Sequence, residues 1–176
     1  TPGITTSEDV VWWFRQKIRD LGYETWFHPT VDIQRADPTT EGAERSFAIK
    51  PKADVILPGD LIHVDIGITY LRLHTDIQQH AYLLKPGETD VPTSIQNAFN
   101  KANRLQDILT MQFKVGKTGN QILAGALKKK KKEDITASIY SHPIGYHGHA
   151  AGPAIGMWDN QGKVVGTGDQ IVRKNT

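Results

Sequence analysis

Apolar residues recur every three or four positions near the start of the chain, which is the spacing of one face of an α-helix. They are Val10, Trp13, Phe14, Ile18 and Leu21. The hydroxyl residues Thr5, Thr6 and Ser7 precede this run as candidate N-caps, and Gly22 follows it. The pattern therefore predicts a helix over residues 7–21, with its apolar positions facing a core.

The pattern then changes to that of β-strands, interrupted by a polar stretch. Residues 24–29 form an aromatic run, in which Pro29 is expected to stop a strand because proline has no backbone N–H. Residues 34–52 are mostly polar and are expected to form a surface loop. Alternation over residues 61–68 and a second strand-like run over residues 73–84 predict an antiparallel hairpin.

Two further helices are predicted in the second half of the chain. One follows Pro92 and carries an apolar stripe, made of Ile95, Ala98, Phe99, Ala102, Leu105, Ile108 and Leu109. The other follows Thr118 and runs into five lysines, residues 128–132, whose charges suit the negative C-terminal end of a helix. The lysine run is interpreted as a solvated helix end, with an acidic binding partner as the alternative. Helices combined with a hairpin indicate the α+β class, without a clear domain boundary.

The composition narrows the class of function. Of the 176 residues, 38% are apolar and 23% are charged, which is typical of a soluble globular protein. The net charge of +2 includes the five clustered lysines, so no nucleic-acid partner is predicted. No apolar run approaches the roughly 20 residues that span a bilayer, so no membrane partner is predicted. The absence of cysteine excludes disulfides, thiolate metal sites and a cysteine nucleophile.

Two aspartates of the predicted hairpin are the first candidates for chemistry. If the hairpin is symmetric about a turn between Tyr70 and Leu71, Asp65 and Asp76 lie opposite each other on one face. Facing carboxylates repel each other unless a cation, a shared proton or solvent compensates them, and hard divalent ions prefer carboxylate oxygens. The hairpin therefore predicts a metal site, with two exposed aspartates beside a turn as the alternative.

A segment rich in glycine and histidine supplies a second candidate group. His142, His147 and His149 lie within eight residues, among glycines at positions 145, 148 and 152. If the segment is extended, His147 and His149 point to the same face. Imidazole is a common metal ligand and a general acid or base near neutral pH, so this segment predicts a binding or catalytic site.

These residues, in this order, resemble the pita-bread metallopeptidases, which include methionine aminopeptidases, proline aminopeptidases and Xaa-Pro dipeptidases. The resemblance rests on Gly59-Asp-Leu-Ile-His-Val-Asp65-Ile-Gly67, on Asp76-Ile77, and on Gly148-His149-Ala-Ala-Gly152. The opening Thr-Pro-Gly-Ile-Thr-Thr and the helix after it are also similar, so the resemblance covers nearly the whole chain. The segments 26–29 and 142–149 are most similar to the bacterial Xaa-Pro aminopeptidase branch.

The resemblance implies an α+β pita-bread fold, a curved antiparallel sheet with helices on its outer face, with residues 1–176 as one partial catalytic domain. It implies a site for two divalent ions (Mn, Co or Zn), in which Asp65 binds one ion, Asp76 bridges both and His149 binds the second. A metal-activated water would remove the N-terminal residue of a peptide substrate, with proline expected to follow that residue. Because family members are often dimers, a homodimer is also expected.

Two departures from the family change what this chain is expected to do alone. The family uses two glutamates after the metal histidine, and this chain has none after Glu133. We therefore expect a sequence that lacks the C-terminal strands of the fold, binds metal poorly and has no peptidase activity by itself. Proline-specific relatives carry three histidines that this chain replaces, at Ala48, Gly145 and Gly156. His142 and His147 are then the candidates for orienting the substrate and stabilising the tetrahedral intermediate.

The remaining candidates carry weaker signals. Trp158 is expected either to wall a substrate pocket or to pack in the core. His63 and His74 are interpreted as ordinary strand histidines, with partners of the aspartates as the alternative. Gly116-Lys-Thr118 lacks the earlier glycine of a phosphate-binding loop, so Thr118 is interpreted as an N-cap.

Two other functions are open at this point. The chain resembles a non-catalytic member of the family, a peptide-binding or interaction module, in its missing histidines and glutamates. A creatinase-like hydrolase shares the fold but works without metal, and the retained Asp65, Asp76 and His149 argue against it. The sequence favours a cytoplasmic over an exported protein only slightly, so no localisation is assigned.

Overall fold

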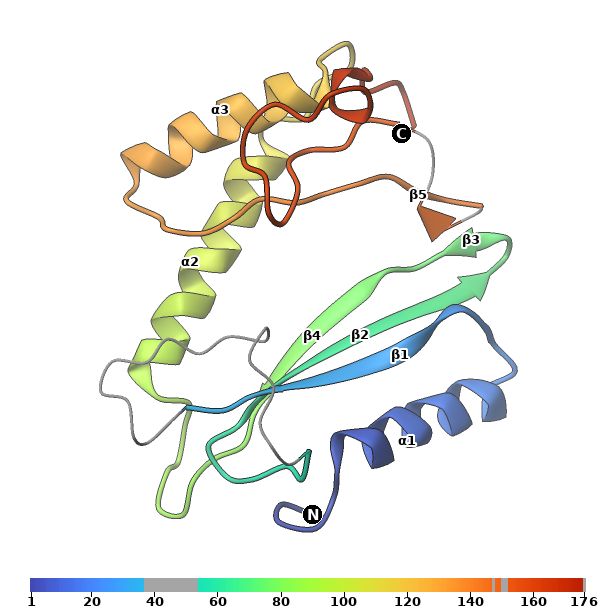
Figure 1. Cartoon of the computed structure of the whole chain (residues 1–176), viewed down its shortest axis with the longest axis vertical. Coiled ribbons are helices and arrows are strands. Elements are labelled where there is room, and N and C mark those ends of the chain that lie inside the picture. The colour runs from blue at the N-terminus through green and yellow to red at the C-terminus, as the bar shows by residue number, and fades with distance from the viewer. Residues whose placement is uncertain (37–53, 147, 150–151, 176) are drawn as a thin grey trace. The chain divides into compact units, whose positions relative to one another are not determined.

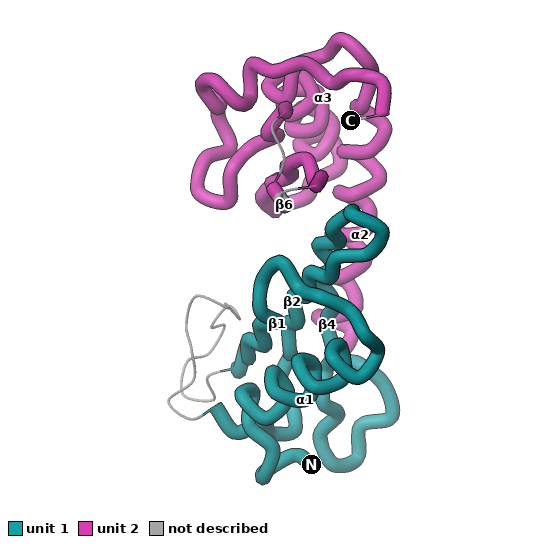
Figure 2. Tube along the Cα trace, turned by 90° about the vertical axis from the view of Figure 1, so that its right-hand side faces the viewer, with its two compact units in different colours: residues 1–91 teal, residues 92–176 magenta. Residues whose placement is uncertain are grey.

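A computed structural model describes residues 1–36, 54–146, 148–149 and 152–175 of the chain (Figure 1). The chain divides into two compact units, Thr1–Val91 and Pro92–Thr176, which are described separately (Figure 2). Unit 1 contains α1 (Ser7–Asp20), β1 (Glu24–Gln34), β2 (Leu61–Tyr70), β3 (Leu73–His74) and β4 (Ile77–Tyr82). Unit 2 contains α2 (Thr93–Thr110), α3 (Gly119–Lys132), β5 (Ile144–Gly145), β6 (Gly148–His149) and the 3-10 helix η1 (Thr167–Asp169). The predicted α+β class is confirmed.

The sheet of unit 1 has an apolar face and a polar face. β2 pairs in antiparallel fashion with β1 on one side and with β3 and β4 on the other. A buried core is made of Val31, Ile33, Ile56 and Ile62, against which Val10, Val11 and Phe14 pack. Because side chains alternate along a strand, His63 and Asp65 point to the face opposite Ile62. α1 therefore covers the apolar face and leaves the polar face of β2 to the candidate aspartates (Figure 1).

A capping box sets the start of α1. The Asp9 backbone N–H donates to Thr6 Oγ1 at 3.0 Å, and the Thr6 backbone N–H donates to Asp9 Oδ2 at 2.8 Å. The hydrogen bond from the Thr6 backbone, followed by that of its side chain, lowers the pKa of Asp9. The helix ends before Gly22, which has a φ of 75°, so the predicted helix is confirmed.

β1 continues past Pro29, so the prediction that proline stops this strand is wrong. The register with β2 shifts between Thr25 and Phe27 and again between Phe27 and Thr30. Pro29 lies within the second irregularity, where the ladder does not require its missing N–H. The strand then resumes with Thr30 opposite Asp65.

A buried ion pair anchors the end of β1. Asp60 is 1% exposed and accepts hydrogen bonds from Arg35 Nε and Nη2, both at 2.8 Å. The Leu57 backbone N–H donates to the same carboxylate at 2.7 Å, which leaves this buried charge well satisfied. The hydrogen bond to Asp60 raises the pKa of Arg35. Of the predicted loop over residues 34–52, Gln34 still belongs to β1, and residues 37–52 lie outside the described part of the chain.

Unit 2 is built on a second core to which both of its long helices contribute. The buried residues are Leu105, Ile108, Ile122, Leu123, Ala126, Ile135, Ile139, Ile155 and Val172. Of the apolar stripe predicted on α2, only Leu105 and Ile108 are buried, whereas Phe99 is 51% exposed.

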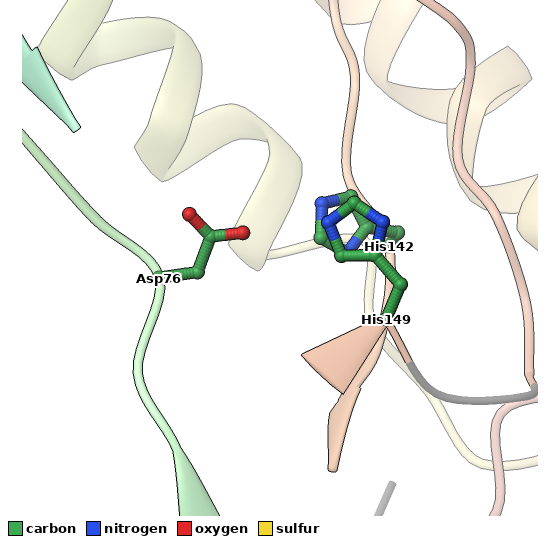
Figure 3. A group of neighbouring side chains, drawn as sticks. All are labelled: Asp76, His142 and His149. Carbon is green, nitrogen blue, oxygen red and sulfur yellow. The ribbon is translucent and has the colours of Figure 1, made fainter. Parts of the chain in front are cut away.

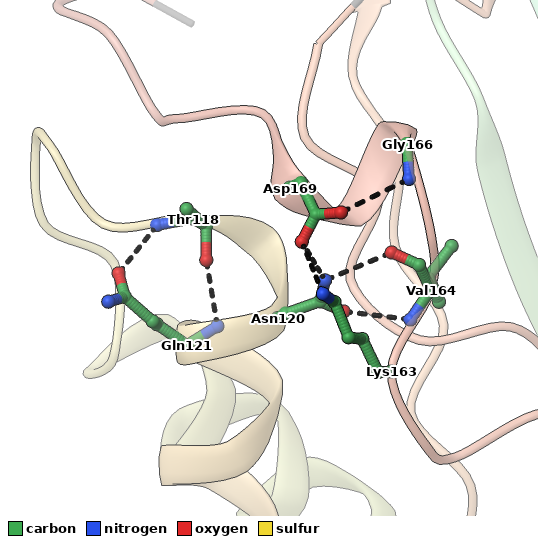
Figure 4. Close-up of polar contacts among 7 residues, drawn as sticks. All are labelled: Thr118, Asn120, Gln121, Lys163, Val164, Gly166 and Asp169. Atoms are coloured by element: carbon green, nitrogen blue, oxygen red, sulfur yellow. Dashed lines mark hydrogen bonds and ion pairs between the residues drawn. The ribbon is translucent and has the colours of Figure 1, made fainter.

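Polar contacts at the start of α3 hold the C-terminal segment in place (Figure 4). Thr118 and Gln121 form a capping box, as the N-cap interpretation of Thr118 predicts. Asn120 Nδ2 donates to the Val164 carbonyl and to Asp169 Oδ1, both at 2.9 Å, and Asn120 Oδ1 accepts from the Val164 N–H at 2.8 Å. These hydrogen bonds connect α3 to Val164 and to η1, and the two that involve Val164 are partly buried.

The lysine run forms the last turn of α3, which confirms its interpretation as a helix end. Lys130 Nζ donates to the Ala137 carbonyl. Glu133 accepts two hydrogen bonds from Arg104, at 2.7 and 2.8 Å, and lies 3.3 Å from Lys129 Nζ. The Arg104 hydrogen bonds in particular lower the pKa of Glu133 to about 2. Within the described residues, every helix is too short or too polar to cross a lipid bilayer.

Candidate metal centre

Asp65 lies in β2, and Asp76 lies in the two-residue break between β3 and β4. Asp65 pairs with Gln78, and Tyr70 pairs with Leu73. The turn is therefore centred between residues 71 and 72, one position later than predicted, and the predicted direct pairing of the two aspartates is wrong. They still share one face of the sheet, because positions offset by two residues across an antiparallel pair are diagonal neighbours.

The surroundings of Asp65 destabilise its negative charge. Burial raises the pKa of Asp65, and the charge of Asp76 and a side-chain hydrogen bond with Asp76 raise it further. Asp65 Oδ1 is buried and has no hydrogen-bond partner among the described residues. Leaving such an acceptor unsatisfied costs about 1–3 kcal/mol. Two adjacent carboxylates with an unsatisfied buried oxygen fit the donor set of a hard divalent cation.

The histidines of the same sheet have partners of their own. His63 Nε2 lies 2.9 Å from Gln78 Oε1, and His63 Nδ1 lies 3.9 Å from Asp32 Oδ2. His74 Nδ1 lies 2.9 Å from Thr69 Oγ1. These contacts agree with the interpretation of His63 and His74 as strand histidines. The charge of His63 nevertheless acts on Asp65, whose pKa it lowers against the larger raising effects of burial and Asp76.

In unit 2, the structure brings His142 and His149 together (Figure 3, which also labels Asp76 of unit 1). β5 and β6 pair in antiparallel fashion, with Ile144 opposite His149. The two imidazole centroids are 3.8 Å apart, and a ring nitrogen of each lies within 4.8 Å of the other ring's. His142 is half-buried, with Nδ1 3.2 Å from the Pro143 carbonyl oxygen, and His149 is exposed. Two imidazoles at this spacing can donate nitrogens to one ion.

Trp158 and Asp169 do not belong to this histidine pair. Trp158 is 74% exposed, so the core alternative is wrong and its role in a substrate pocket stays a prediction. His147 lies outside the described residues. Asp169, an acidic residue after the metal histidine, binds Asn120 and the Gly166 N–H with its two oxygens, so it serves the structure of unit 2 (Figure 4).

Sequence reasoning assigned His142 to substrate handling and missed its proximity to His149. A usable signal was present in the glycines at 145 and 148. These residues face each other in the β5–β6 pair and are separated by two residues, as in a tight hairpin. Such a hairpin returns the chain toward His142, which allows the two imidazoles to meet.

Comparison with known proteins adds to this geometry. A family profile described as Metallopeptidase family M24 matches residues 1–171. No curated protein sequence matches the chain significantly.

Solved structures match nearly the whole chain. X-Pro aminopeptidase from Thermotoga maritima has a TM-score of 0.67 and 20% identity, over 97% of this chain and 44% of that chain. A dipeptidase from Pyrococcus horikoshii has a TM-score of 0.67 and 17% identity, over 99% of this chain and 43% of that chain. Methionine aminopeptidase from Thermotoga maritima has a TM-score of 0.60 and 17% identity, over 98% of this chain and 66% of that chain. The chain thus spans less than half the length of the first two, and the likeness confirms the predicted pita-bread fold.

Proposed function

Because the chain belongs to metallopeptidase family M24, whose members are metal-dependent peptidases, we propose that it supplies metal ligands to an exopeptidase. This exopeptidase would remove the N-terminal residue from Xaa-Pro peptides. The observation that carries the proposal is the Asp65–Asp76 pair, with its unsatisfied buried oxygen and raised Asp65 pKa. The proline preference is supported by the segment 142–149 and by the X-Pro aminopeptidase and prolidases that share the fold.

The ligands are assigned by the order Asp, Asp, His of the family motif. Asp65 and Asp76 would each offer carboxylate oxygens, and His149 would offer an imidazole nitrogen. The proximity of His142 to His149 makes His142 a further candidate ligand in addition to its predicted role toward the substrate. Mn, Co and Zn are the candidate ions, and a homodimer is the proposed assembly.

When bound, the ions would polarise the scissile carbonyl and lower the pKa of a nucleophilic water. The chain's own residues would do the rest. The two ionised carboxylates would offset part of the ions' positive charge and would offer them only acceptor oxygens. His142 and His147 would orient the substrate and stabilise the negative charge of the tetrahedral intermediate, and Trp158 would wall the substrate pocket.

A non-catalytic peptide-binding module is the second candidate function. It is favoured by the residues at positions 48, 145 and 156, which are Ala, Gly and Gly where proline-specific relatives carry histidine. Because residues 134–176 hold no glutamate and the family uses two glutamates after the metal histidine, we also propose that the 176-residue chain alone has little peptidase activity. Metal-dependent binding of a peptide supports the peptidase site, whereas equal binding with and without metal supports the module.

The test is calorimetric titration of the 176-residue chain with Mn²⁺, followed by titration of the loaded and metal-free chain with Ala-Pro and Ala-Ala. Asp76→Asn is expected to weaken Mn²⁺ binding at least about 10-fold, because it removes a ligand charge. Asp159→Asn is the control, since Asp159 is an exposed aspartate outside the proposed ligand set. Ala-Pro is expected to bind more tightly than Ala-Ala, and only with metal. Equal Mn²⁺ binding by Asp76→Asn and the parent chain would contradict the assignment.

A further inference from the structure

The break that carries Asp76 is held by an unusual exchange of hydrogen-bond partners. The Thr75 N–H donates to the Ile68 carbonyl at 2.9 Å, as in a regular ladder. The Ile68 N–H, however, donates to Thr75 Oγ1 at 3.0 Å. The Thr75 hydroxyl thus takes the place that its carbonyl would occupy in the ladder, and the Thr75 carbonyl is released from β2.

The released carbonyl accepts a hydrogen bond from Trp26. The Trp26 Nε1–H donates to the Thr75 carbonyl oxygen at 2.7 Å, across 49 positions of the sequence. This carbonyl belongs to the peptide group that joins Thr75 to Asp76, so the indole fixes the orientation of the peptide plane that precedes Asp76. A side chain of β1 therefore determines the direction in which the chain enters the candidate ligand.

The position of the indole is itself fixed from several sides. Trp26 lies at the first register shift of β1, where one extra residue is inserted opposite β2. Its ring packs edge-on against Phe27, with centroids 4.6 Å apart, and lies 5.6 Å from the His74 ring. Gly67 leaves the space for these rings, because a Cβ there would overlap both Trp26 and Phe27.

We propose that Trp26 is a positioning residue, whose indole N–H holds the Thr75–Asp76 peptide so that the Asp76 carboxylate stands beside that of Asp65. The inference rests on the proposed function, in which Asp76 is a metal ligand. Trp26 would touch neither the ions nor the substrate. Its contribution would be to restrict Asp76 to the orientation that the ions require, as partners of metal ligands generally do.

The test distinguishes the hydrogen bond of the indole N–H from the packing of the aromatic ring. Trp26→Phe keeps an aromatic ring over Gly67 but loses the donor, and Trp12→Phe changes a 56% exposed tryptophan of α1 as the control. Mn²⁺ affinity is measured by calorimetry and Co²⁺ coordination by its absorption spectrum. Trp26→Phe is expected to weaken Mn²⁺ binding by about 10- to 100-fold and to alter the Co²⁺ spectrum, while Trp12→Phe changes neither. A merely structural role would lower the Tm without altering the Co²⁺ spectrum of the folded protein.

Two results would overturn the inference while leaving the proposed function intact. One is Mn²⁺ binding by Trp26→Phe equal to that of the parent chain. The second result is obtained on the parent chain by ¹⁵N NMR. It is solvent exchange of the Trp26 indole N–H that is as fast as the exchange of the Trp12 indole N–H. The parent chain is expected to bind Mn²⁺ weakly, because it lacks the family's two glutamates. If it binds no Mn²⁺ even at millimolar concentration, the proposed metal site fails, and the positioning role falls with it.

Discussion

Asp65 differs from the other residues of β2 in that the fold works against its ionised form. Among the described residues, its buried Oδ1 has no hydrogen-bond partner, and its neighbour Asp76 carries the same charge. In that same part of the chain, no lysine or arginine pairs with Asp65, whereas Arg35 pairs with Asp60. The protein therefore compensates the charge of Asp60, and the proposed metal site would compensate that of Asp65.

This difference predicts that metal-free Asp65→Asn is more stable than the parent chain at neutral pH. The pKa of Asp65 in the folded chain lies above its ordinary value of 3.8, so the folded state binds the proton more tightly than the unfolded state. The parent chain therefore loses stability as the pH rises from the pKa of Asp65 in the unfolded state through its higher pKa in the folded state. An asparagine has no proton to lose and can also donate to Asp76, so the variant avoids this loss. The gain is expected near pH 7, where both states of the parent chain have lost the proton, and is expected to vanish near pH 3, where both hold it.

Urea unfolding in the presence of a chelator checks this prediction. Asp159→Asn is the control, and its stability is expected to follow that of the parent chain at both pH values. Lower stability of Asp65→Asn at neutral pH would show that the ionised carboxylate is favourably placed in the metal-free chain, against the argument from its unsatisfied oxygen.

At the residue scale, the sequence supplied the candidate ligands but not the contacts around them. Asp65, Asp76 and His149 are candidates by residue type, order and flanking motif, because the chemistry of a metal ligand is local, and their role as ligands stays a prediction. The contact between His142 and His149 depends on a hairpin of two-residue strands, whose periodicity is too short to detect. The role of Trp26 depends on a bulge and on a hydroxyl replacing a carbonyl, and neither leaves a pattern in the sequence.

At the scale of elements, the hairpin of β2 and β3 explains the error of one residue in register. Leu71 and Arg72 have φ values of 49° and 66°, so both central residues of this two-residue turn lie in the left-handed region. Turns of this kind are usually marked by Asn-Gly or a similar pair, which this sequence lacks. Because no such pair marks the turn, the hydrophobic pattern is as compatible with a turn centred between Tyr70 and Leu71 as with the observed turn centred between Leu71 and Arg72.

The same turn predicts a stabilising substitution. Replacing Leu71-Arg72 with Asn-Gly is expected to stabilise unit 1 by about 0.5–1 kcal/mol, because the new residues adopt positive φ at lower cost. Little packing is lost, since Leu71 is 77% exposed. Chemical unfolding followed by tryptophan fluorescence measures the change. Arg19→Gly in the last turn of α1 is the control and is expected to destabilise by a similar amount, because its backbone is helical. A loss of stability in the turn variant would contradict the strain at Leu71 and Arg72.

At the scale of the whole molecule, the three helices, the main hairpin and the fold could be predicted, but the division into units could not. The helical and strand-like patterns and the family motifs led to the α+β pita-bread fold, which the comparisons confirm. The boundary at residue 91 carries no linker composition, because Pro92 and Thr93 read equally well as the start of a helix. The division becomes visible only in the packing, where each unit has its own buried core.

Because each unit has its own core, we expect a destabilising substitution in one unit to leave the stability of the other unit unchanged. Ile122 is fully buried in the core of unit 2, so Ile122→Ala is expected to cost about 2–5 kcal/mol through lost contacts and an empty cavity. Hydrogen exchange followed by mass spectrometry should show reduced protection in α2 and α3 and unchanged protection in α1 and β2. Ile33→Ala, in the core of unit 1, is the matched variant and should give the reverse pattern. Loss of protection in both units from either substitution would mean that the two cores unfold as one cooperative body. A change in unit 2 could then affect Asp65 and Asp76 of unit 1 through global stability.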